Sequence, residues 1–204
     1  MRSEEELDNI ARVLTLARQQ GFVRARDLDQ IRVERVYLSR LVEKDLLMKV
    51  GRGIYMMPEA PISEWHTLAV TARLIPDATI CLLSALRFHS LGTQNPHEVW
   101  IAVNRRAATS HLDYPKVRII RPSNAALTAG VDIHQIEGVA VRIYSAAKTV
   151  VDCFRYRNKI GMDVALEALR EGLRARKFTR DDLLGFAKQC HVTTVIRPYL
   201  EALS

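Results

Sequence analysis

The spacing of hydrophobic residues near the N-terminus predicts a helix. Apolar side chains recur there every three or four residues, as one face of an α-helix requires; they are Leu7, Ile10, Val13, Leu14 and Ala17. Ser3, followed by Glu6 three residues later, is typical of a capping box at a helix start. Gly21 is suited to end the helix, because glycine accepts the left-handed conformation common there. The first helix is therefore expected between Ser3 and Gly21.

Two further helices and a hairpin are expected before residue 60. The pattern predicts a short helix over Ala25–Gln30 and a longer one over Arg32–Lys44. Two short apolar runs, 46–50 and 54–57, flank Gly51-Arg52-Gly53 and predict two strands joined by a tight turn. Three helices followed by a hairpin is the order of a winged helix-turn-helix domain.

The expected third helix has an apolar stripe opposite a polar, locally basic face. The stripe consists of Ile31, Leu38, Leu41 and Val42. On the other face arginines are suited to bind guanine edges or phosphates, and apolar groups such as Val33 to meet thymine methyls. The expected DNA-contacting residues are Arg32, Arg35, Val36, Tyr37, Ser39, Arg40 and Lys44, with Arg52 at the tip of the wing. The alternative interpretation is an ordinary three-helix domain with a solvated charged face.

Pro58 and Pro61 end this unit, which gives a first domain of residues 1–60 and a second of 61–204. The second has a mixed pattern. Helices are expected over 63–74, 79–90, 145–156, 162–175 and 193–203, with another capped by Thr179. Strands are expected over 98–103, 117–121, 132–136 and 139–144, the last two joined at Glu137-Gly138. The expected fold class is α+β: an N-terminal winged helix-turn-helix followed by a mixed α/β domain with a small sheet and several helices.

Composition narrows the class of protein. The chain has 204 residues, 48% hydrophobic and 26% charged, which excludes a disordered or collagen-like protein. Its net charge of +7 favours a polyanionic partner. Residues 1–60 carry 11 basic and 10 acidic groups, against 19 and 13 in the remainder, so most of the excess lies in the second domain. DNA binding by the first domain therefore depends on its pattern of residues.

The cellular location is expected to be the cytoplasm. Cys81, Cys153 and Cys190 are far apart and lack metal-ligand spacing, which is typical of buried thiols in a reducing compartment. No apolar run approaches the roughly 18 residues of a membrane span. The acidic N-terminus does not resemble a signal peptide.

Sequence motifs give no support to catalysis. Ser145 and Lys148 match the S-x-x-K pattern of penicillin-binding enzymes, but the S-D-N and K-T-G motifs of those enzymes are missing. The simpler interpretation is a helix-capping serine followed by an exposed lysine. Asp77 and Glu98 resemble a nuclease acidic pair, but Trp100 stands where such a site needs lysine. We expect no enzyme activity, no cofactor and no metal.

Basic residues of the second domain are candidates for contact with phosphate or a partner. They are Lys148, Arg155, Arg157, Lys159, Arg170, Arg174 and Lys177. A solvated face in which Glu167 and Glu171 neutralise the neighbouring arginines is the alternative. A further basic patch consists of Arg105, Arg106, Lys116, Arg118 and Arg121. These surfaces would extend contact along DNA, or bind RNA or an acidic protein.

Four segments carry a resemblance that covers nearly the whole chain. They are YLSRLVEKDLLMKVGRGIYMMPE (37–59), LSALRFHSLGTQNPHEVWIAV (83–103), GVAVRIYSAAKTVVDCFRYRNKIGMDVALEALREGL (138–173) and TTVIRPYLEAL (193–203). In these segments the chain resembles the AbiEi family of antitoxins. That family is the antidote half of type IV toxin–antitoxin operons, which act in abortive phage infection.

The resemblance implies a winged-helix autorepressor that binds inverted repeats in double-stranded DNA upstream of its own operon, with cooperation between protomers. It implies that the second domain provides antitoxicity against a nucleotidyltransferase-like toxin without a stable complex. Ser145, Lys148 and the stretch 155–159 would belong to the signature of that domain. The alternative function is an interaction protein or enzyme whose C-terminal domain binds RNA, a nucleotide or the toxin directly.

Overall fold

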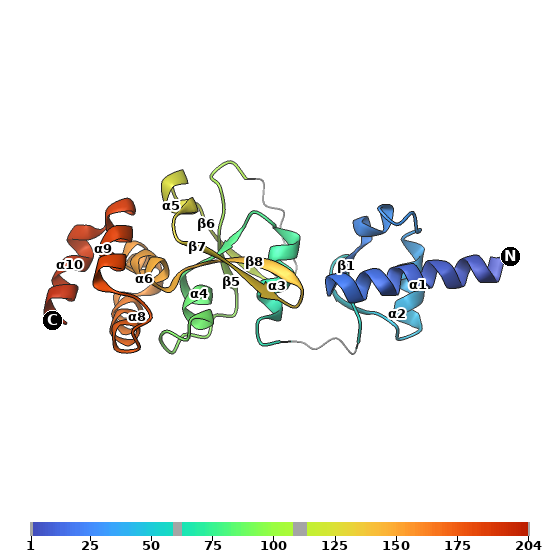
Figure 1. The fold of residues 1–204 in the computed structure, drawn as a ribbon, viewed down its shortest axis with the longest axis horizontal. Helices are drawn as coiled ribbons and strands as arrows, with labels where there is room; N and C mark the ends of the chain where they lie inside the picture. The colour runs from blue at the N-terminus through green and yellow to red at the C-terminus, as the bar shows by residue number, and fades with distance from the viewer. Residues whose placement is uncertain (1, 59–62, 108–113, 204) are drawn as a thin grey trace.

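The computed structural model describes residues 2–58, 63–107 and 114–203. They form two lobes, which Figure 1 shows side by side along the long axis of the molecule. The first lobe comprises residues 2–58 and the second residues 63–203. The fold class is α+β, as the sequence predicts, with a winged helix-turn-helix followed by a mixed sheet and helices.

The first lobe has the predicted order of helices followed by a hairpin. Its elements are α1 (Arg2–Gln20), β1 (Val23–Arg24), the 3₁₀ helix η1 (Ala25–Asp29), α2 (Val36–Glu43), β2 (Met48–Gly51) and β3 (Ile54–Met56). The strands form an antiparallel sheet in the order β1-β3-β2. Val13, Leu28 and Leu41 are among the buried residues that pack the helices together.

Three details of this lobe differ from the sequence prediction. The helix start at Ser3 is wrong, because α1 already includes Arg2. The second helix is a 3₁₀ helix rather than an α-helix. The third begins at Val36 rather than at Arg32, whose positive φ of 53° cannot continue a right-handed helix. Val33 is buried in the core rather than placed on the outer face.

A five-stranded mixed sheet forms the middle of the second lobe. Its strands are β4 (Thr79–Ile80), β5 (Val99–Ala102), β6 (Val117–Ile120), β7 (Val131–Ile136) and β8 (Val139–Tyr144), in the order β6-β5-β4-β8-β7. The four predicted strands are confirmed. The helix predicted to begin at Thr79 is wrong at its start, because Thr79 and Ile80 form the central strand and pair with β5 and β8.

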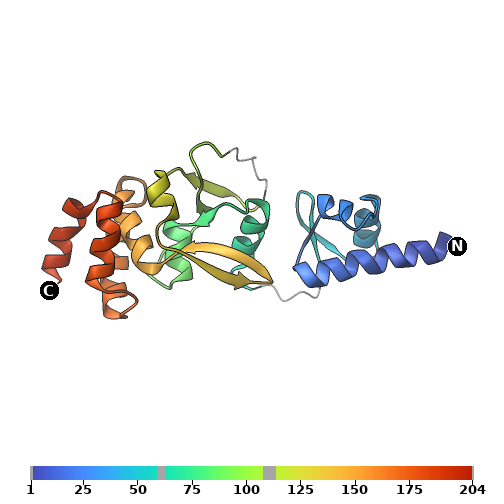
Figure 2. The same cartoon turned by 45° about the horizontal axis from the view of Figure 1, so that its top comes forward.

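Helices of the second lobe pack around the sheet. Figures 1 and 2 show α6, α8, α9 and α10 gathered at the end of the molecule remote from α1. The helices of this lobe are α3 (His66–Leu74), α4 (Leu82–Phe88), α5 (Asn124–Thr128), α6 (Ala146–Arg155), α7 (Arg157–Ile160), α8 (Met162–Arg174), α9 (Arg180–Gln189) and α10 (Thr193–Ala202). The caps predicted at Ser145 and Thr179 are confirmed, since both side chains accept backbone N–H groups. Ser63 Oγ accepts the backbone N–H of Trp65 at 3.2 Å, but α3 begins at His66, so its N-cap residue is Trp65 rather than Ser63.

The two lobes are in direct contact. Phe22 and Met56 of the first lobe belong to the same buried apolar cluster as Leu68 and Ile143 of the second. The tip of the β7–β8 hairpin lies against the end of α1. A side chain at Gly21 would place its Cβ 2.5 Å from a backbone oxygen of that tip. The first lobe is therefore held by packing as well as by the chain connection.

Candidate nucleic-acid interface

The exposed face of α2 is the feature of the first lobe suited to enter a DNA groove. Leu38 and Leu41 point inward and are fully buried. Because an α-helix turns 100° per residue, the opposite face carries Val36, Ser39, Arg40 and Glu43, all of which are exposed. This face offers one cation, one hydroxyl and one apolar group, together with an acid that the sequence analysis did not place there.

The remaining predicted contact residues surround this face rather than sharing it. Arg32 lies in the turn before α2 and is exposed. Arg35 immediately precedes α2 and pairs with Asp29 at 3.0 Å, where both side chains are 62% exposed. Lys44 follows the last turn and is exposed. The structure thus places the basic groups at both ends of a short helix.

Tyr37 and Arg40 turn toward α1. The Tyr37 hydroxyl accepts a hydrogen bond from Asn9 Nδ2 at 3.3 Å. The Arg40 guanidinium lies 5.3 Å from the centre of the Tyr37 ring and 3.7 Å from a Glu6 carboxylate oxygen. The ring and the carboxylate hold Arg40 while leaving its side chain 47% exposed, so it is positioned in advance and accessible.

A groove of about 710 Å³ separates the N-terminal half of α1 from α2, and its charge is mixed. The charged groups that line it are Glu5, Glu6, Asp8, Glu34, Arg12, Arg32 and Arg40. The acids of α1 therefore reduce the positive potential that residues 32–52 alone would produce. The acidic start of the chain is visible in the sequence, but its position beside α2 is not.

The β2–β3 hairpin forms the wing. Gly53 has a positive φ of 70°, which the tight turn requires, and Arg52 at the tip is exposed. The ladder shifts register between Lys49 and Gly51. Tyr114 of the second lobe lies close to Gly51. The second lobe therefore contacts the wing beside its turn, next to the exposed cation Arg52.

The comparison with known families agrees with this geometry. Residues 11–58 match a family described as transcriptional regulator, AbiEi antitoxin. The first lobe is thus similar in sequence to the AbiEi family. The match covers about a quarter of the chain and includes α2 and the wing. No curated protein matches the chain. The resemblance stated for the N-terminal segment is thus confirmed, and AbiEi proteins are antitoxins that regulate transcription.

Lys148, which the sequence analysis expected to be exposed, is fully buried in α6. Its ammonium bonds to the Asp152 carboxylate one turn later and lies 4.1 Å from the centre of the Tyr144 ring. The other Asp152 oxygen accepts from Cys190 Sγ at 3.7 Å. Burial raises the pKa of Asp152, and the charge of Lys148 offsets part of this effect. The expectation of an exposed Lys148 that contacts phosphate is wrong.

The S-x-x-K motif is explained by this arrangement. Ser145 Oγ accepts from the backbone N–H of Lys148 at 3.4 Å, whereas the Lys148 ammonium bonds to Asp152. The hydroxyl thus caps a helix, and the amine forms a buried ion pair. The three cysteines are buried as predicted, and burial raises the pKa of the Cys81 and Cys153 thiols.

The other basic residues of the second lobe do not form one surface. Arg155 donates to the carbonyl oxygen of Cys190 at 2.5 Å and Arg157 to that of Phe154 at 3.0 Å, so both support the fold. Lys159 is exposed. Lys177 donates to the carbonyl oxygen of His89.

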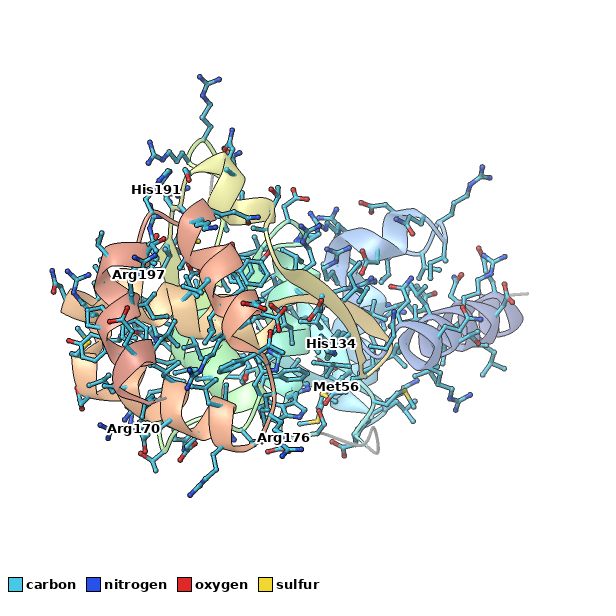
Figure 3. All side chains as sticks on the ribbon, turned by 60° about the vertical axis from the view of Figure 1, so that its left-hand side comes forward. Met56, His134, Arg170, Arg176, His191 and Arg197 are labelled. Carbon is cyan, nitrogen blue, oxygen red and sulfur yellow. The ribbon has the colours of Figure 1, made fainter. Side chains whose placement is uncertain are left out.

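Arg170 and Arg174 are exposed on α8, and Figure 3 shows Arg170 and Arg197 on the C-terminal helices. Glu171 between these arginines accepts from the backbone N–H of Gly92 at 2.6 Å, which directs that acid toward the loop after α4. The exposed cations of this lobe are therefore spread over several elements.

Within residues 2–58, 63–107 and 114–203, no group of three or more potential metal ligands comes together. None of the helices in the same ranges has the length and apolar character needed to cross a membrane.

Proposed function

We propose that this protein is a DNA-binding autorepressor and antitoxin of a type IV toxin–antitoxin system. Residues 1–60 would form the DNA-binding domain and residues 61–204 the antitoxin domain. The observation that carries the proposal is an exposed α2 face beside a wing with an exposed arginine, in the lobe that matches antitoxin regulators. The protein would bind inverted repeats upstream of its own operon and perform no chemistry itself.

The geometry of α2 supports specific roles for its residues. Val36 and Ser39 would meet base edges in the major groove, and Arg40 would bind a guanine or a neighbouring phosphate. Arg32, Arg35 and Lys44 at the helix ends would contact the flanking phosphates. Arg52 would contact the backbone or the minor groove from the wing. Tyr37 would position Arg40 rather than contact DNA.

Replacing Arg40 by alanine tests the base-reading role. We expect a loss of about 1–3 kcal/mol in binding to the upstream DNA, with a smaller loss on scrambled DNA, because a bidentate arginine discriminates between bases. The measurement is a gel-shift titration at two salt concentrations with scrambled competitor. Arg197→Ala removes the same charge from an exposed site on α10 and should bind as the parent does.

Equal weakening on both DNAs would show that Arg40 contacts only phosphate. Equal, salt-sensitive binding of the parent to both DNAs would contradict specific repression and leave a merely basic protein.

Antitoxicity is tested by expression together with a nucleotidyltransferase-like toxin. We propose that the antitoxin acts without a stable complex, so growth should be restored while the two purified proteins do not co-elute. Arg40→Ala should still restore growth, because the second domain would provide this activity. Loss of rescue with Arg40→Ala would place DNA binding within the antitoxin mechanism.

A further inference from the structure

Strand β7 is an open edge of the five-stranded sheet. Within the described residues it pairs with β8 alone, and no other strand lies along its second edge. Ile133, in the middle of the strand, has a side chain 67% exposed. Open edge strands tend to pair with other chains unless charges, prolines or bulges prevent it. β7 contains no proline and no bulge, and Asp132 is its one permanently charged residue.

The opposite edge of the sheet has the protection that β7 lacks. Strand β6 is flanked by Pro115 and Pro122, and its segment carries Lys116, Arg118 and Arg121. A second copy of β6 would meet the same positive charges. The contrast between the two edges singles out β7 as the one able to pair with its own copy.

The β7–β8 hairpin determines which backbone groups point outward. Glu137 and Gly138 both have positive φ, and Ile136 pairs with Val139 on either side of this two-residue turn. In such a hairpin the flanking pair is hydrogen-bonded, and bonded and non-bonded pairs then alternate along the ladder. Residues 131, 133 and 135 therefore direct their N–H and C=O groups away from β8.

We propose that two copies of this chain associate through antiparallel pairing of their β7 strands about a two-fold axis at Ile133. Ile133 would face its own copy, and Val131 would face Gln135 of the second copy. Each of these pairs would exchange the backbone hydrogen bonds that point outward. Asp132 of each copy would lie opposite His134 of the other copy. These two pairs are not joined by backbone hydrogen bonds, and in such pairs the side chains of neighbouring strands are closest.

The side chains support this register. An acid opposite a histidine is a complementary pair, and the two-fold axis creates it twice. His134 Nε2 is buried without a hydrogen-bond partner within the described residues. Its ring packs edge-on against Phe88, which fixes it beside the strand edge. Figure 3 shows His134 on the β7–β8 ribbon.

The association would bring two DNA-binding lobes together in opposite orientations. The hairpin tip points toward the first lobe, so an antiparallel copy would place its first lobe at the other end of the pair. A two-fold dimer matches an inverted repeat. Self-association does not require DNA and is measured without it. The dimer proposal and the proposed DNA-binding function can therefore fail independently of each other.

Placing a charge at position 133 is the decisive test, because residue 133 of one copy would lie opposite residue 133 of the other. Ile133→Lys and Ile133→Glu should each weaken self-association at least about tenfold, since like charges would oppose one another across the axis. An equimolar mixture of the two variants should associate again. Leu7→Lys is the control, because Leu7 on α1 is 66% exposed and lies away from the sheet. Circular dichroism checks that each variant is folded.

The measurement is sedimentation velocity of the full chain over a concentration series. Because strand pairing alone buries less than a standard interface, we expect the dimer to form at roughly 10–100 μM protein. A parent that stays monomeric throughout this range would overturn the proposal. Unchanged association of both single variants would also overturn it, as would a mixture that stays monomeric.

Discussion

Replacing Lys148 by methionine should lower the free energy of unfolding by about 3–5 kcal/mol, because one partner of a buried ion pair would be left alone. Both side chains are almost fully buried, and the ammonium bonds directly to the Asp152 carboxylate. Methionine nearly conserves the length and volume of the side chain, so the loss reports the missing charge rather than a cavity. Urea unfolding followed by circular dichroism measures it.

The double variant Lys148→Met with Asp152→Leu separates the charge from the packing. Removing both charges should recover most of the loss, since a buried ion pair replaced by apolar groups is often near neutral. Lys159→Met, an exposed lysine in the neighbouring helix, should change stability by less than about 0.5 kcal/mol. A Lys148→Met protein as stable as the Lys159→Met protein would contradict the structural role of the pair.

The sequence could not reveal that Lys148 is buried. Helix α6 is buried on every side from Ala147 to Phe154. Lys148, Asp152 and Arg155 form one polar stripe at helical spacing. Such a stripe normally faces solvent, so helical periodicity predicts an outward lysine where the structure has an inward one. The useful signal was Asp152 four residues after Lys148, a spacing that places the two side chains together. That spacing is equally common on exposed helices, and only the packing decides between the two.

The order of elements was predictable, and the details of the candidate interface were not. The wing and the long hairpin show clear turn residues, and their strands were placed to within a residue or two. The start of α2 was missed because Arg32 adopts a left-handed conformation, which sequence patterns assign to glycine or asparagine. Strand β4 has only two residues, too few to show alternation. The acids of α1 beside Arg40 depend on tertiary packing.

Asp27 forms a second buried charge cluster, at the contact between the lobes. Its carboxylate accepts hydrogen bonds from the backbone N–H and the guanidinium of Arg24 and lies 3.3 Å from a guanidinium nitrogen of Arg73. Arg24 also donates to the carbonyl oxygen of Arg73 at 2.9 Å. One carboxylate therefore holds two arginines, one from each lobe, and lies between the DNA-binding helices and the mixed sheet.

Replacing Asp27 by asparagine should lower the free energy of unfolding by about 2–3 kcal/mol, because two partly buried guanidinium groups would lose their counter-charge. This loss is smaller than the loss expected for a fully buried ion pair, because the side chains of Arg24 and Arg73 are 16% and 23% exposed. Asp29→Asn is the matched control. Its ion pair with Arg35 is exposed, so its loss should cost less than about 1 kcal/mol.

The dependence of the free energy of unfolding on pH in the acid range is a second test of the Asp27 cluster. Burial alone would raise the pKa of Asp27, but the hydrogen bonds and charges of Arg24 and Arg73 outweigh it and lower the pKa below 3.8. The stabilisation is thus present above the pKa of the unfolded chain and is lost as the pH falls through the lower pKa of the folded protein. Parent and Asp29→Asn should lose this contribution below about pH 4, whereas Asp27→Asn should lack that step. An identical acid profile for Asp27→Asn and the parent would contradict the assignment of this step to Asp27.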